Sequence, residues 1–128
     1  MKLSRLIDNY KKDRSQENYN QILLNIFSDL DKVLILPSKL RNDNNGFDLK
    51  SIYDSNGGMY LVAYTDSGFV EDTDEAFIKI TIRGIISKVL ENDICLGLCI
   101  NPDLKIDDDN MHKQCIIPKE HIVKILNS

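Results

Sequence analysis

The longest apolar run of the chain ends in an Asn-Pro pair, within residues 92–104. Residues 94–100 carry no charged side chain, and an apolar run of this length bounded by turn residues favours a buried strand. Pro102 has no backbone N–H and favours extended geometry at Asn101, so it ends the hydrogen-bonded ladder. We therefore predict a buried central strand. Its polar end, at Asn101 and Pro102, is the first place to look for a binding surface, because strand ends present side chains from a rigid scaffold.

The composition is that of an ordinary globular protein. The chain has 128 residues, of which 42% are hydrophobic and 28% are charged, and this balance is too apolar for a disordered chain. A chain of this length suits one domain and can bury roughly two thirds of its unfolded surface. We therefore expect residues 1–128 to form a single domain.

The charge balance is acidic and bears on the choice of partner. Sixteen Lys and Arg residues against twenty Asp and Glu residues give a net charge of −4. This argues against a nucleic acid or an anionic membrane as partner, because both require clustered positive charge. The one basic cluster, formed by Lys11, Lys12 and Arg14, is interpreted as a solvated helix end rather than a phosphate site.

The N-terminal residues and the cysteines indicate a cytoplasmic protein. Charged residues occur where a signal peptide needs an uninterrupted apolar core, and no apolar run approaches the roughly 20 residues of a membrane span. Three cysteines, an odd number, fit reduced buried thiols better than a disulfide framework.

Apolar spacing predicts the secondary structure of the N-terminal half. The first dozen residues have the period of a short amphipathic helix, and a second helix begins near Ser15, a plausible N-cap. Residues 33–36 form an apolar strand that we expect to end at Pro37. The polar residues 38–48 are predicted to form a loop. Residues 49–53 and 59–64 flank Asn56-Gly57, which is typical of a tight hairpin turn.

The C-terminal half is predicted in the same way. Residues 77–90 fit both a strand and a helix, and we divide them into a strand at 77–82 and a helix at 84–92, because Gly84 weakens a helix interior. A short strand at 114–117 follows the central strand, and Pro118 suits the start of a terminal helix. The predicted fold is α+β: a mixed β-sheet of about five to six strands packed by N-terminal, central and C-terminal helices.

Cysteine and histidine spacing raises the question of a zinc site. Cys95, Cys99, His112 and Cys115 form two close pairs separated by about a dozen residues, as zinc ligands often do. However, Cys95 and Cys99 would lie roughly 13 Å apart on a strand, at about 3.3 Å per residue. We interpret the cysteines as small buried hydrophobic residues. The acidic runs at 71–75 and 107–109 lack the ligand pattern of an EF-hand, so no metal or cofactor is predicted.

No catalytic constellation is predicted. Asp66-Ser67-Gly68 resembles the Asp-Ser/Thr-Gly turn of retroviral-type aspartic proteases, but Phe69 stands where that family has a small residue, so this is a remote alternative. His121, beside Glu120, is interpreted as an exposed residue rather than a general base. A nucleophile, a base and an orienting residue that could meet are not evident, and we predict that the protein is not an enzyme.

The order of the elements resembles the N-terminal domain of the SseB family, named for enhanced serine sensitivity. The resemblance rests on Tyr64-Thr65 after an apolar strand, on residues 97–102 (Gly-Leu-Cys-Ile-Asn-Pro), on the helix stripe at 26–30 and on the strand at 33–37. It covers about residues 15–126. It implies an α+β domain without established catalysis, whose biochemical role is poorly defined.

Three functions are compatible with this reading. We expect a non-catalytic protein-binding or regulatory module, whose acidic loops at 65–75 and 101–109 would steer a basic partner if they share one face. An amino-acid sensor with its ligand between the strand ends, and an immunity protein to a toxin, are the alternatives. The candidate binding residues are Tyr64, Thr65, Asp66, Asn101, Pro102, Asp107, Asp108 and Asp109.

Overall fold

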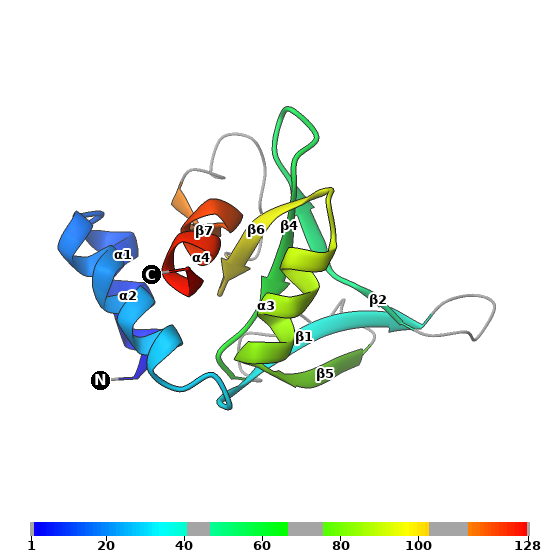
Figure 1. Ribbon diagram of the computed structural model, residues 1–128, viewed down its shortest axis with the longest axis horizontal. Coiled ribbons are helices and arrows are strands. Elements are labelled where there is room, and N and C mark those ends of the chain that lie inside the picture. The colour runs from blue at the N-terminus through cyan, green and yellow to red at the C-terminus, as the bar shows by residue number, and fades with distance from the viewer. Residues whose placement is uncertain (1, 41–46, 67–75, 103–112, 128) are drawn as a thin grey trace.

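The protein has the α+β architecture that the sequence predicts (Figure 1). The computed structural model describes residues 2–40, 47–66, 76–102 and 113–127. In these ranges the strands number seven and divide into a four-stranded and a three-stranded sheet. In chain order the elements are α1 (Leu3–Lys12), α2 (Gln16–Ser28), β1 (Val33–Leu40), β2 (Phe47–Leu49), β3 (Ser51–Tyr53), β4 (Met59–Ala63), β5 (Ala76–Thr81), α3 (Ile82–Glu91), β6 (Cys95–Ile100), β7 (Cys115–Pro118) and α4 (Lys119–Leu126).

The predicted central strand is β6. The four-stranded sheet has the order β3-β4-β6-β7, in which β6 pairs parallel with β4 and antiparallel with β7. Five of its six residues are buried, and Leu96 is the exposed one. The strand ends at Ile100, just before the Asn-Pro pair, as expected from the missing N–H of Pro102.

Strand β1 corrects one prediction, because it continues through Pro37 instead of ending there. In the three-stranded sheet, of order β2-β1-β5, Pro37 lies opposite Phe77 of β5. Its carbonyl accepts a hydrogen bond from the N–H of Lys50 at 2.9 Å, on the opposite side of β1. Upstream on that side β1 contacts Tyr64, and downstream it pairs with β2 from Ser38 onward. The proline thus stands where β1 changes partner, and its missing donor is tolerated there. The predicted loop at 38–48 is shortened at both ends by β1 and β2.

The two sheets meet at a backbone junction. Ile35 and Tyr64 exchange two hydrogen bonds, Tyr64 N–H to the Ile35 carbonyl at 2.7 Å and Ile35 N–H to the Tyr64 carbonyl at 2.9 Å. Lys50 joins the same place, since its N–H donates to Pro37 and its carbonyl accepts from Val62 N–H at 3.1 Å. The segment β2–Lys50–β3 therefore runs along the border of both sheets.

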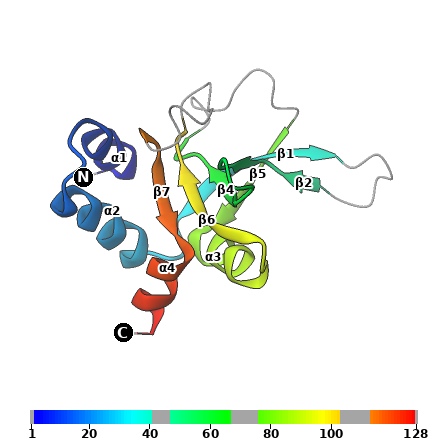
Figure 2. The same ribbon diagram turned by 90° about the horizontal axis from the view of Figure 1, so that it is seen from above.

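The core lies between the helices and one face of the strands. Side chains alternate along β4 and β6, so that Leu61, Ala63, Leu98 and Ile100 join the large cluster formed with all four helices. The intervening Val62, Tyr64 and Cys99 belong to a smaller cluster on the other face. Figure 2 shows α3 and α4 on the same side of β6, with α1 and α2 beyond β7.

The local signals in the sequence are confirmed where they specify caps and turns. The hydroxyl of Ser15 accepts a hydrogen bond from Asn18 N–H at 3.2 Å and begins α2. Thr81, which was predicted to lie within the strand at 77–82, caps α3 in the same way through Gly84 N–H, so α3 begins at Ile82 and not at residue 84. The predicted β3–β4 hairpin is confirmed, and Gly57 has a φ of +80° in its turn, whereas the φ of Asn56 is not positive.

Candidate functional site

The two strand ends predicted as a binding site lie together. Because β4 and β6 are parallel neighbours, Thr65 and Asn101 follow them at the same edge of the sheet. The Asn101 side chain accepts a hydrogen bond from Thr65 N–H at 2.9 Å and donates one to the Thr65 hydroxyl at 3.0 Å. The Asn101 backbone N–H donates to the Ala63 carbonyl at 2.9 Å. The polar groups at the two strand ends therefore serve as one another's hydrogen-bond partners.

The strand ends are also closed from outside. Asn101 is 3% exposed, and its φ of +52° corrects the extended geometry predicted before Pro102. This φ lies in the left-handed region, which Asn tolerates better than most residues. Pro102 is buried beside it, and the ammonium of Lys11 donates a hydrogen bond to the Asn101 carbonyl. We interpret this group, Thr65, Asn101 and Lys11, as a structural lock and refer to it as the strand-end lock.

The basic cluster is therefore more than a solvated helix end. Lys11 takes part in the strand-end lock, and Arg14 donates hydrogen bonds to the carbonyls of Lys113 at 3.0 Å and Gln114 at 2.9 Å. Lys12 is exposed, as expected. The cations at 11 and 14 fasten the corner between α1 and α2 to the ends of β6 and β7, because carbonyl oxygens are good acceptors for charged donors.

The acidic residues of the predicted site are only partly described. Tyr64 is buried at the end of β4, whereas Asp66 is exposed two residues later. Asp107, Asp108 and Asp109 lie outside the described residues, as does most of the 65–75 loop. The acidic patch and the Asp66-Ser67-Gly68 turn therefore stay predictions.

The three cysteines are buried, as predicted. Cys95, Cys99 and Cys115 form no disulfide; Cys99 lies within β6, whereas Cys95 and Cys115 are the first residues of β6 and β7. Burial raises the pKa of the Cys115 thiol to about 12, against the opposing effect of Lys11 and Arg14. Within the described ranges, which omit His112, three His, Cys, Asp or Glu residues nowhere gather as a metal site would require.

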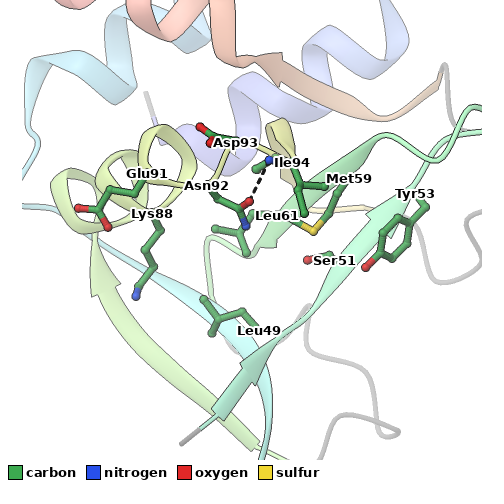
Figure 3. Close-up of a pocket in the computed structure, with 11 residues that line it drawn as sticks. Leu49, Ser51, Tyr53, Met59, Leu61, Lys88, Glu91, Asn92, Asp93 and Ile94 are labelled. Atoms are coloured by element: carbon green, nitrogen blue, oxygen red, sulfur yellow. Dashed lines mark hydrogen bonds between the residues drawn. The ribbon is translucent and has the colours of Figure 1, made fainter.

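A large hollow lies beside β3, in a segment for which no motif was predicted. Its volume is about 890 Å³, which is within the range of ligand-binding clefts. Figure 3 shows that it lies between one face of the β2–β3 segment and the end of α3 with the following turn. The lining residues are Leu49, Ser51, Tyr53, Met59, Leu61, Lys88, Glu91, Asn92, Asp93, Ile94 and Cys95.

The walls of the hollow combine apolar and charged side chains. Tyr53 and Ile94 are 61% and 69% exposed, so large apolar surfaces face solvent at its rim. In Figure 3 the Lys88 side chain extends from α3 toward the strand that carries Leu49, whereas Glu91 points away from it. The Asn92 side chain accepts a hydrogen bond from Ile94 N–H at 3.0 Å and fixes the turn after α3.

The backbone beside the hollow has an open edge. Lys50 bonds to Pro37 and Val62, and Asp54 N–H bonds to the Gly58 carbonyl at 2.9 Å. These residues direct their backbone groups toward β1 and β4, and direction alternates along a strand.

By this alternation the backbone groups of Leu49, Ser51 and Tyr53 point outward, away from both sheets. Their outward N–H and C=O groups have no hydrogen-bond partner among the described residues. The same three side chains line the hollow. We refer to the segment from Phe47 to Tyr53 as the open edge.

The hairpin that carries the open edge is held by Asp54. One carboxylate oxygen accepts hydrogen bonds from Asn56 N–H at 3.0 Å and Gly58 N–H at 2.7 Å. Partial burial, and then the negative charge of Asp54, raise the pKa of the Tyr60 hydroxyl. Tyr60 therefore stays neutral at physiological pH and can donate to Asp54.

Sequence reasoning missed the hollow and wrongly predicted that His121 is exposed. His121 is partly buried, and its Nδ1 lies 2.6 Å from the Tyr19 hydroxyl.

The available signal for the open edge was the strand at 49–53, whose Leu49, Ser51 and Tyr53 share one face. Periodicity shows a shared face but not whether another strand covers the edge.

Comparisons with known proteins and the character of the helices add two observations. Comparison with protein-family models, with curated proteins and with solved structures finds no match to this chain. The resemblance to the SseB family therefore stays a prediction. None of the described helices has the length and apolar character needed to cross a bilayer.

Proposed function

We propose that the protein is a protein-binding module that pairs an extended segment of its partner with the open edge. The observation that carries the proposal is the coincidence of two features at Leu49, Ser51 and Tyr53. Their backbone groups point outward without partners among the described residues, and their side chains line the hollow. Strand addition uses both features, since main-chain hydrogen bonds give affinity and pockets for alternate side chains give specificity.

The partner segment can be described by its chemistry. Added beside β3, it would place every second side chain on the face of the hollow. The exposed Ile94 and the neighbouring Met59 favour an apolar side chain there, and Lys88 favours a carboxylate near Leu49. The best occupant is therefore an extended segment with an apolar residue and an acidic residue two positions apart.

The proposal is tested with a peptide selected for binding. A displayed library of 12-residue peptides with apolar and acidic residues at alternating positions would be selected on the folded protein, and the affinity of one selected peptide measured by titration. Ser51→Pro removes an outward N–H at the centre of the open edge. We expect it to weaken binding at least tenfold, because one ladder hydrogen bond and the close approach of the peptide are both lost.

A matched control is available in the same hairpin. Ser55 is exposed in the β3–β4 turn, beyond the open edge, and proline is favoured at this kind of turn position. Ser55→Pro should bind the peptide like the unmodified protein. Equal affinity of Ser51→Pro and the unmodified protein, with the fold intact, would contradict strand addition at this edge.

A further inference from the structure

A second cavity lies at the other end of the four-stranded sheet, away from the open edge. It has a volume of about 240 Å³ and forms where the corner between α1 and α2 meets β7 and the start of α4. Figure 2 shows these helices gathered beside β7. Its lining residues are Tyr10, Arg14, Ser15, Gln16, Tyr19, Ile116, Pro118 and His121.

The cation of this cavity is held by neutral groups. The Arg14 guanidinium lies 4.5 Å above the centre of the Tyr10 ring and donates to the carbonyls of Lys113 and Gln114. It also contacts the Tyr10 hydroxyl at 3.4 Å. Among the described residues no carboxylate pairs with it. A guanidinium has five N–H donors, so donors remain beyond these three bonds, and no described carboxylate neutralises the positive charge.

His121 adds a second donor to the same cavity. Burial is the main cause that raises the pKa of the Tyr19 hydroxyl, so this hydroxyl keeps its proton at neutral pH. It lies 2.6 Å from Nδ1 of His121. In the tautomer whose Nδ1 accepts this proton, the ring carries its own proton on Nε2, because a neutral imidazole has one donor and one acceptor. In that tautomer Nε2 is a hydrogen-bond donor.

We propose that this cavity binds a small carboxylate with an apolar body. Arg14 and His121 supply donors, while Tyr10, Tyr19, Ile116 and Pro118 supply apolar walls. A carboxylate matches the planar fork of one guanidinium. A phosphate carries more charge than the single arginine in this lining neutralises, so the monoanion is the better match.

The test uses defined probes and a variant that adds one negative charge to the lining. Acetate, benzoate and 3-phenylpropionate, each beside its neutral amide, would be titrated into labelled protein while the resonances of Tyr19 and His121 are followed by NMR. At least one carboxylate should move these resonances saturably, and its amide should not. Gln16→Glu places a carboxylate in the lining at the first residue of α2, where negative charge suits a helix start. It should weaken binding at least tenfold.

Three further arms decide between outcomes. Gln21→Glu adds the same charge at an exposed position of α2 outside the lining and should leave binding unchanged. Arg14→Gln should abolish binding, whereas Arg83→Gln, an exposed arginine paired with Asp31, should not affect it. Inorganic phosphate binding more tightly than every carboxylate would overturn the carboxylate assignment. The site itself would be refuted if no carboxylate moved these resonances, or if Gln16→Glu bound as tightly as Gln21→Glu.

Discussion

The strand-end lock and the open edge use polar groups in opposite ways. At the lock, the side chain of Asn101 and the backbone and hydroxyl of Thr65 satisfy one another, and Lys11 covers the remaining carbonyl. At the open edge, the outward backbone groups of Leu49, Ser51 and Tyr53 meet no partner in the described part of the chain. The polar groups of the lock are therefore paired with one another, whereas no described residue pairs with the outward backbone groups of the open edge.

This difference shows why polar residues at strand ends are an unreliable sign of a binding site. Thr65 and Asn101 were chosen from the sequence because polar side chains follow apolar strands. The structure brings them together but commits their hydrogen bonds to each other. Groups that are already paired gain little from a ligand, since binding would exchange one hydrogen bond for another.

The largest expected effect comes from breaking the lock. Asn101→Ala removes both side-chain bonds to Thr65 and places a Cβ-bearing residue without local hydrogen bonding at a φ of +52°. A left-handed conformation costs an ordinary residue about 1–2 kcal/mol, and each lost hydrogen bond about 1 kcal/mol. We expect the free energy of unfolding, measured by urea denaturation, to fall by about 2–4 kcal/mol.

Asn101→Gly separates the two causes. Glycine adopts positive φ readily, so this variant loses the hydrogen bonds while avoiding the conformational strain. It should be more stable than Asn101→Ala. Equal loss in the two variants would show that the strain at Asn101 contributes nothing.

The fold was predictable where its determinants are local. Ser15 and Asn56-Gly57 specify a cap or a turn within a few residues, and the structure confirms the elements that they begin or join. The continuation of β1 through Pro37 was not predictable from local sequence. Proline is tolerated there because the neighbour of β1 changes at that residue, from Tyr64 upstream to β2 downstream.

The candidate sites depend on contacts that no local pattern encodes. Arg14 and Lys113 are 99 residues apart in sequence, and Tyr19 and His121 are 102 residues apart. The open edge depends on which strands are neighbours in the sheets, and strand order is not readable from alternation alone. The apolar spacing along the chain therefore predicted the fold class but not the hollow or the arginine cavity.

An intermediate effect should appear at alkaline pH, next to the lock. Cys115 pairs with Ile100 in the β6–β7 ladder, and burial raises its pKa from 9.0 to about 12. The unfolded thiol ionises near pH 9 while the folded one stays protonated, so the unfolded state binds fewer protons as pH rises. Stability from this group is complete below pH 9 and is lost between about pH 9 and 12, amounting to about 1.4 kcal/mol by pH 10.

The measurement compares two pH profiles of unfolding. Cys115→Ala lacks the ionising group, so its free energy of unfolding should fall less between pH 8 and 10 than that of the unmodified protein. The difference between the slopes matters here, because the cavity left by alanine lowers stability equally at both pH values. Parallel profiles would mean that water reaches the thiol in the folded state.

The smallest effect on stability is expected at the open edge itself. Ser51→Pro removes a backbone N–H that has no partner among the described residues, and proline is tolerated on edge strands where the N–H faces solvent. We expect the free energy of unfolding to change by less than about 0.5 kcal/mol, the range of ordinary surface substitutions.

The neighbouring residue gives the contrast that makes this result informative. Ile52 lies opposite Tyr60 and directs its backbone groups toward β4, by the same alternation that turns those of Ser51 outward. Ile52→Pro should therefore cost about 3 kcal/mol or more, through the lost ladder bond and the displaced buried side chain. If Ser51→Pro destabilised the protein as much as Ile52→Pro, the N–H of Ser51 would be in use within the folded chain. The open edge would then be closed, and strand addition there would lose its physical basis.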